Sequence, residues 1–270
     1  MKCISRTAVF LTTAVFLTTA VVLIAAGGAT TANGRDLGAV RDLGAARGLA
    51  AVDFGSGALG DYRPYAHCDT NCRGVDYATK RYVYSTSWDA ADVGLMGDSI
   101  TGRGWGDLLV LLATRNQDLA VNYWGNRPTA PAVDWLIQRI DAGKRIPRVI
   151  VMATGSNDIY SPPAMTAQIR RLKAALPAGT VLFWVDVQVQ VWRQTQTVQI
   201  NDQRNSMAVN QQIWMEIDPS RVVRWAELFW GAPWRLSYYL ADGVHPKYER
   251  GTRAWAATLY SPLLKAGVLG

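Results

Sequence analysis

Ser99 occupies a position in the sequence where a serine side chain can act as a nucleophile. It follows Gly97 and Asp98 at the end of an apolar run, where the chain must turn before an expected helix. The free backbone N–H groups at the start of a helix favour developing negative charge. A serine there is a candidate nucleophile if a base can reach it. The rest of the chain must then supply the base, the acid that orients it and donors for an oxyanion.

His245 is the histidine best placed to be that base. The chain has two histidines, and His67 lies in a cysteine-containing loop near the N-terminus. Asp242 precedes His245 by three residues, in a turn that Gly243 and Pro246 impose. This spacing lets the carboxylate reach Nδ1 of the imidazole, which leaves Nε2 for a serine hydroxyl. We therefore predict a triad of Ser99, His245 and Asp242.

Two further apolar runs are followed by groups that can donate to an oxyanion. Asn157 follows the run 148–153, and its side-chain amide can point into the same space as Ser99. Gly125 follows the run 119–124, and a glycine can bring its N–H close to a ligand because it has no side chain. Together with the N–H of Ser99, these groups are the predicted oxyanion donors. Asp98 is expected to shape the turn that carries Ser99 and to cap the helix after it.

The elements that must position these residues alternate from Asp92 onward. Apolar runs typical of buried strands are separated by segments with helical spacing of apolar residues. Strands are predicted at 93–96, 119–124, 148–153, 181–187 and 221–225, and helices at 105–113, 132–140, 163–176, 202–217 and 247–264, the last interrupted near Pro262. This alternation predicts a parallel sheet of about five strands with helices on both faces. In such a sheet the site lies beyond the carboxyl ends of the strands.

The order of these motifs resembles the SGNH hydrolase family, also called GDSL esterases and lipases. The matching blocks are Gly97-Asp98-Ser99, the glycine at 125, Gly155-Ser156-Asn157-Asp158 and Asp242-Gly243-Val244-His245. The second block departs from the family's commoner small, glycine-rich version, since Gly125 stands in Trp-Gly-Asn-Arg-Pro. The resemblance covers about residues 90–262.

The resemblance implies a flavodoxin-like α/β/α sandwich that hydrolyses O-acyl esters with no cofactor and no metal. Ser99 attacks the acyl carbon, His245 moves the proton, and Asp242 orients His245. The backbone N–H groups of Ser99 and Gly125 and the Asn157 side chain hold the oxyanion. The residues considered as a possible substrate lining are Trp105, Trp124, Arg127, Tyr160, Trp192 and Trp234. The insertion 188–199 is interpreted as a substrate loop, with a strand extension or a solvated loop as the alternatives.

The N-terminal region predicts export. Lys2 and Arg6 precede a long uncharged run, so residues 1–32 are expected to be a secretory signal peptide or an uncleaved membrane anchor. Residues 33–60 form a glycine- and alanine-rich linker, and residues 61–89 form an extension packed on the hydrolase domain of residues 90–270. An exported chain favours a disulfide between Cys68 and Cys72; free thiols and a metal site are the alternatives.

The composition limits the classes of partner that the protein is expected to bind. The formal net charge is +7 and the hydrophobic fraction is 49%, which suits a globular domain. The basic residues are scattered, which argues against nucleic acid as a partner and fits attraction to anionic cell surfaces. We expect a secreted monomer, either free or associated with the cell envelope, that acts on a small-molecule or glycan ester. Three functions remain open: a serine esterase, an O-acyltransferase or deacetylase of cell-surface polysaccharide or peptidoglycan, and a catalytically silent cell-surface binding protein.

Overall fold

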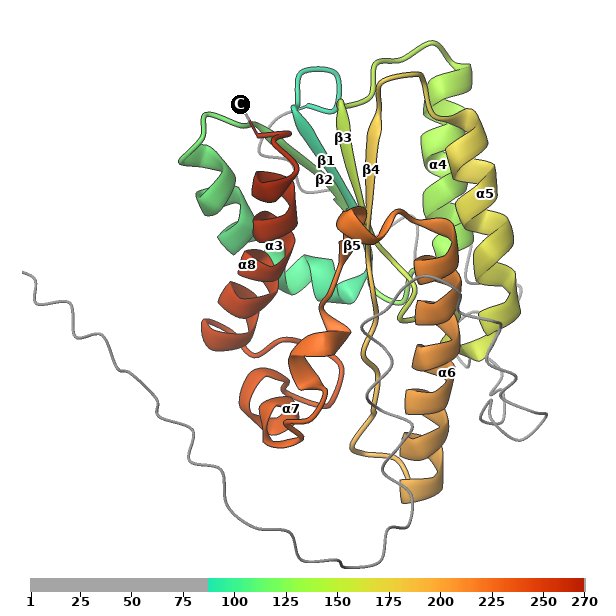
Figure 1. Cartoon of the computed structure of the whole chain (residues 1–270), viewed down its shortest axis with the longest axis vertical. Coiled ribbons are helices and arrows are strands. Elements are labelled where there is room, and N and C mark those ends of the chain that lie inside the picture. The colour runs from blue at the N-terminus through green and yellow to red at the C-terminus, as the bar shows by residue number, and fades with distance from the viewer. Residues whose placement is uncertain (1–86, 270) are drawn as a thin grey trace, which may run out of the picture. The chain divides into compact units, whose positions relative to one another are not determined.

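The computed structural model describes residues 87–269, which form one five-stranded parallel sheet (Figure 1). The strand order is β2-β1-β3-β4-β5, so the chain crosses over between β2 and β3. Val93 in β1 is in register with Leu119 on one side and Val149 on the other. The strands are β1 Val93–Gly97, β2 Leu119–Tyr123, β3 Val149–Ala153, β4 Val181–Val185 and β5 Val222–Val223. The predicted fold class is confirmed.

Helices cover both faces of the sheet and make it the middle of three layers. Figure 1 shows α3 and α8 on one face and α4, α5 and α6 on the other. The α-helices are α3 Ser99–Ala113, α4 Thr129–Asp141, α5 Met165–Ala175, α6 Gln196–Glu216, α7 Trp234–Tyr239 and α8 Arg250–Lys265. Each face has its own apolar cluster, and both β1 and β3 are buried along their whole length. The continuous apolar runs in the sequence follow from this two-sided burial.

The start of α3 differs from the prediction and determines where Ser99 lies. The helix begins at Ser99, six residues before the predicted start at Trp105, although three glycines follow within the first two turns. One of them, Gly104, lies against Trp255 of α8, and a β-carbon at that position would come within 2.3 Å of the indole ring. The glycines that weaken helix propensity therefore serve close packing of α3 on α8.

Three other elements differ from the prediction. Helix α6 begins at Gln196, inside the segment expected to be a substrate loop or strand extension. Helix α7 was not predicted, because its aromatic and polar residues show no clear helical spacing and none of its residues is buried. Helix α8 continues through Pro262 to Lys265.

The predictions for the N-terminal region fall outside the described residues. The signal peptide or anchor, the linker, almost all of the extension and the Cys68–Cys72 disulfide remain predictions. Within residues 87–269, no helix has both the length and the apolar character needed to cross a bilayer.

Asp186, directly after β4, is a buried carboxyl group whose protonation should affect stability. Its Oδ1 accepts a 2.6 Å hydrogen bond from the backbone N–H of Ala226, and burial raises the pKa of Asp186 to about 7. The folded protein therefore holds a proton between about pH 4 and 7 that the unfolded chain has lost. The free energy of unfolding should fall as the pH rises through this window, by at most roughly 4 kcal/mol.

Asp186→Asn should remove this loss. We expect the decrease in melting temperature between pH 5 and pH 8 to be smaller in the variant than in the wild type, as measured by thermal unfolding. Asp141→Asn, at an exposed position at the end of α4, is the control and should follow the wild type. Parallel curves for all three proteins would show that Asp186 titrates as an ordinary carboxyl group.

Candidate active site

The candidate site lies where the crossover of the sheet leaves the carboxyl ends of neighbouring strands open. Strands β1 and β3 are adjacent, and the chain leaves β1 into α3 while it leaves β3 into the turn 154–157. Helices α3 and α4, which follow β1 and β2, cover opposite faces. Ligands of such sheets bind at this switch point. The fold therefore brings the motif around Ser99 and the motif around Asn157 to one edge.

Ser99, His245 and Asp242 form a continuous hydrogen-bonded chain. The Oγ of Ser99 lies 2.8 Å from Nε2 of His245, and Nδ1 of His245 lies 2.8 Å from Oδ2 of Asp242. Because an ionised carboxylate can only accept, Nδ1 carries the proton and Nε2 can accept from the serine hydroxyl. Residues 146 positions apart in the sequence thus meet in the order nucleophile, base, acid.

Asp242 is ionised because its loop surrounds it with donors. Its Oδ1 accepts from the backbone N–H groups of Val244 and His245 at 3.1 and 2.8 Å, while Oδ2 faces the imidazole. Partial burial acts to raise the pKa of Asp242, but the hydrogen bonds from His245 and from these backbone groups outweigh it and hold the pKa well below its usual range. The carboxylate can therefore fix the tautomer of His245 throughout the neutral pH range.

Asp98 supports the turn and takes no part in the Ser–His–Asp chain. It is fully buried, its Oδ1 accepts from the backbone N–H of Ile100 at 2.8 Å, and its Oδ2 accepts from Ser156 Oγ–H and from Asn157 at 3.3 Å. Burial raises the pKa of Asp98, and the hydrogen bonds from Ser156 and Ile100 partly offset that rise. These contacts fix the end of β1 to the end of β3. Ser156 is the one contributor here to which the sequence analysis gave no role.

The predicted oxyanion donors come from the ends of three neighbouring strands, β1, β2 and β3. Ser99 is the first residue of α3, where no preceding turn supplies an acceptor for its N–H. Gly125 lies in the turn after β2. The Asn157 side chain donates to the backbone carbonyl of Arg127 at 3.1 Å as well as to Asp98, so it joins the loops after β1, β2 and β3 in this structure.

The six residues considered as a substrate lining differ in burial and in the groups they pack against. Trp124 and Arg127 are buried: the guanidinium stacks 3.6 Å from the Trp124 ring centre and donates to the carbonyl groups of Asn122 and Pro131. That pair packs the β2 loop, and the carbonyl acceptors offset the cost of burying the Nη1 and Nη2 donors of Arg127. The half-buried members pack against the two apolar clusters: Trp105 and Trp192 against one, Tyr160 against the other. Trp234 is exposed on α7.

Residues 187–192 hold the Asp242–His245 loop in place. The N–H groups of Gln190 and Trp192 donate to the carbonyl groups of Gly243 and Asp242 at 3.0 and 3.1 Å. The alternate residues of the segment donate backbone hydrogen bonds to side chains of α6. The N–H groups of Val187, Val189 and Val191 donate to Asn210 Oδ1 (2.7 Å), Ser206 Oγ (3.2 Å) and Asp202 Oδ2 (3.4 Å), respectively. The polar residues at 202, 206 and 210, four apart on one helix face, were the sequence signal for this arrangement.

Gly243 makes this contact possible, and Gly243→Ala should misplace His245. Its φ is +87°, and a β-carbon there would come within 1.7 Å of the Gln190 carbonyl oxygen, a backbone atom that cannot easily give way. We expect kcat for a nitrophenyl ester to fall by about 100-fold, the typical effect of a displacement of about 1 Å at a reacting group.

Gly143→Ala provides the matched control. Gly143 has a similar φ of +66°, but a β-carbon there would meet no atom within 4 Å. Both substitutions therefore place an alanine at a positive φ, but only Gly243→Ala brings the β-carbon against another atom. Equal kcat values for the two variants would contradict a positioning role of the 190–243 contact.

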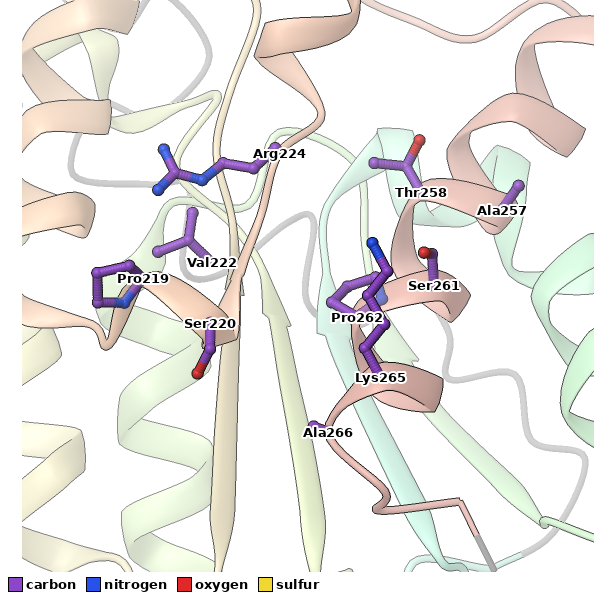
Figure 2. A pocket seen from close by; sticks show the side chains of 10 residues that line it. All are labelled: Pro219, Ser220, Val222, Arg224, Ala257, Thr258, Ser261, Pro262, Lys265 and Ala266. Atoms are coloured by element: carbon purple, nitrogen blue, oxygen red, sulfur yellow. The ribbon is translucent and has the colours of Figure 1, made fainter. Parts of the chain in front are cut away.

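A pocket of about 790 Å³ lies away from these residues. It is formed between β5 and α8, and Figure 2 shows Arg224 on one wall and Thr258, Ser261 and Lys265 on the other. Neither Ser99 nor His245 lines it. Within residues 87–269, no group of three or more His, Cys, Asp or Glu side chains is arranged to hold a metal ion.

Comparisons with known proteins show the fold. No protein-family model matches the chain, and no curated protein matches it in sequence. A GDSL-like lipase from Bacteroides thetaiotaomicron is similar in structure, with 18% identity over 68% of this chain and 93% of its own and a TM-score of 0.52. The lipase/acylhydrolase from Enterococcus faecalis has 15% identity over 64% of this chain and 95% of its own, with a TM-score of 0.51. The chain shares the fold of these enzymes.

Proposed function

We propose that this chain is a secreted serine esterase that hydrolyses O-acyl esters through an acyl-enzyme. The observation that carries the proposal is the pair of 2.8 Å hydrogen bonds that link Ser99 Oγ to His245 and His245 to Asp242. A structural role does not require a serine at a helix start to face an imidazole whose tautomer is fixed by an ionised carboxylate. The likeness of the fold to that of GDSL-like lipases supports the same class of reaction.

The first half of the proposed reaction forms the acyl-enzyme. The Ser99 oxygen forms a bond to the acyl carbon while Nε2 of His245 accepts the hydroxyl proton. The carbonyl oxygen becomes an oxyanion, and the Asp242 carboxylate stabilises the imidazolium. When the tetrahedral intermediate collapses, the bond to the alcohol oxygen breaks and His245 returns its proton to the leaving alcohol.

The second half of the reaction releases the acid. Water attacks the acyl carbon, His245 takes a proton from the water, and the bond to the Ser99 oxygen breaks as His245 returns that proton to Ser99.

The oxyanion would be held by the N–H groups of Ser99 and Gly125 and by the Asn157 amide. The position of Ser99 at the start of α3 supports its part, because the helix dipole adds to the donor. For Asn157 the proposal requires an exchange of partners. One of its N–H groups must turn from Asp98 or Arg127 to the substrate oxygen, and the 3.3 Å bond to Asp98 is the longer of the two.

An acyl-chain series of nitrophenyl esters tests the function. Acetyl, butyryl, octanoyl and palmitoyl esters should be assayed with and without an added sugar alcohol, and the free acid and the transferred ester should be measured separately. We expect free acid as the main product and faster turnover of the short chains, because the residues beside the motifs are mainly aromatic and amide side chains with few aliphatic groups to contact a long acyl chain. Transfer to the sugar in preference to water would make the chain an acyltransferase. No turnover of any ester would overturn the proposal.

The proposed location outside the cytoplasm rests on the N-terminal sequence alone. Lys2, Arg6 and the uncharged run that follows them support export, by cleavage of a signal peptide or as an anchored protein. Expression in a bacterial host with N-terminal sequencing of the exported product distinguishes the two forms. Retention of the full chain inside the cell would contradict export.

A further inference from the structure

We propose that exposed aromatic side chains and the arginines in contact with them, on a surface that begins near Ser99, bind an acidic polysaccharide. This inference rests on the proposed function, because the polysaccharide would carry the ester. We call this surface the aromatic–arginine strip. It consists of Arg103, Trp234, Arg235, Tyr238, Tyr248 and Arg250.

The strip begins at the candidate active site. Arg103 lies one helical turn after Ser99 on α3, and its Nη1 donates to the carbonyl of Pro246 at 3.3 Å, next to His245. Its guanidinium lies 5.6 Å from the ring centre of Tyr248. A polymer that contacts Tyr248 would therefore pass within reach of the serine.

From there the strip continues onto α7. The guanidinium of Arg250 lies 4.8 Å from the ring centre of Tyr238, which contacts Trp234 edge-on at 5.9 Å. Arg235 lies 5.5 Å from the Trp234 ring centre. The segment that carries Tyr248 is fixed to α7, because the backbone N–H of Lys247 donates to the Tyr239 carbonyl at 2.7 Å. The six side chains thus form two contact groups, which the 247–250 segment and its backbone bond to α7 hold next to each other.

The aromatic residues of the strip are exposed to an extent that core packing does not explain. Tyr248 is 75% exposed, Trp234 61% and Tyr238 43%. Exposed aromatic groups that form one patch rimmed by polar residues usually mark a binding surface. Their flat faces can pack against the C–H groups of sugar rings, and their polar atoms can bond sugar hydroxyls.

The charge of the strip favours an anionic occupant. Within residues 87–269, none of its three arginines forms an ion pair, and the only acidic residue in the segment 247–250 is Glu249. A guanidinium matches a carboxylate through two parallel hydrogen bonds. Residues 1–86 contain nine basic and six acidic residues, so this part of the chain lacks the complementary charge. Leu236, the aliphatic residue of α7, packs against the apolar core and is not part of the strip, so an inserted acyl layer would meet only Trp and Tyr rings there. Vesicles are therefore included in the test as the alternative ligand. A polysaccharide with carboxylate-bearing sugars matches both the aromatic rings and the arginines.

Binding can be measured apart from catalysis with full-length Ser99→Ala. The ligands are polygalacturonate, neutral dextran and vesicles that contain phosphatidylglycerol. In this background Trp234→Ala and Arg250→Gln remove one ring and one charge, and Arg115→Gln is the matched control. Arg115 is an exposed arginine beyond the other end of α3. Thermal unfolding verifies that each variant is folded.

We expect polygalacturonate to bind and dextran and vesicles not to bind. Each strip variant should weaken the affinity about fivefold, while Arg115→Gln should not change it. Equal affinity of Trp234→Ala and the control would reduce the interaction to general charge attraction and overturn the proposal. Preferential binding of vesicles would assign the strip to membranes instead, and absence of binding to polygalacturonate would also overturn it. Labelling of wild-type Ser99 by a fluorophosphonate is independent of these binding results. The esterase proposal would therefore remain supported even if the strip did not bind polysaccharide.

Discussion

Ser99→Ala is expected to reduce kcat for ester hydrolysis by roughly 10⁴- to 10⁶-fold, the largest effect of any single substitution in this chain. The oxygen that would form the acyl-enzyme is removed, and His245 loses the hydroxyl that faces its Nε2 at 2.8 Å. The remaining donors can still stabilise attack by water, so a small residual rate should persist. Initial rates with nitrophenyl acetate, measured over several decades of enzyme concentration, give the ratio.

The control for this variant is another serine in the described part of the chain. Ser261 is exposed on α8 and lines the pocket between β5 and α8 (Figure 2), and His245 does not line that pocket. Ser261→Ala should retain the wild-type rate. A Ser99→Ala protein that keeps more than about a tenth of the wild-type kcat would place the nucleophile elsewhere.

Asp242→Asn should lower kcat by about 10³- to 10⁴-fold while leaving the loop intact. The amide oxygen of the new side chain can still accept from the N–H groups of Val244 and His245, which now bond Oδ1 at 3.1 and 2.8 Å. Its NH₂ group would then face Nδ1 and force that nitrogen to accept. The proton moves to Nε2, so His245 can no longer take the proton of Ser99.

Asp134→Asn is the comparison for this substitution. Asp134 forms an exposed ion pair with Arg171 at 2.8 Å, remote from the imidazole, and its loss should leave kcat unchanged. The KM for a small ester should also change little in Asp242→Asn, because the acid does not touch the substrate. If kcat of Asp242→Asn stays within tenfold of the wild type, the tautomer of His245 is not controlled by Asp242.

The alternation of apolar and amphipathic segments was sufficient to predict the sheet and most of its helices. Strands such as β3, buried on both faces, leave a continuous apolar run in the sequence that is easily recognised. The beginning of α3 was missed because glycines such as Gly104 have low helix propensity, and only the packing on Trp255 reveals why they are there. Helix α7 was missed because it is short and its exposed aromatic residues hide the spacing of Leu236 and Tyr239, which pack against the core.

The motif residues were found from the sequence because they are fixed to strand ends. Their surroundings depend on contacts between distant segments, which spacing alone does not show. Arg127 stands beside Gly125 in the sequence, and only the structure shows that its side chain turns inward onto Trp124. In the same way, the contact of Gln190 with Gly243 joins two loops that are 53 residues apart.

The most direct measurement of the central claim is the site of modification by a fluorophosphonate probe. The probe reacts only with a serine whose oxygen is activated by a base, and trypsin should release the modified residue in the peptide 82–103. That peptide also contains Ser85 and Ser87, so fragmentation by mass spectrometry must locate the adduct. We expect one adduct per chain, on Ser99, and none in Ser99→Ala. Absence of an adduct in the folded wild-type protein, or an adduct on another residue that persists in Ser99→Ala, would contradict the assignment of Ser99 as the nucleophile.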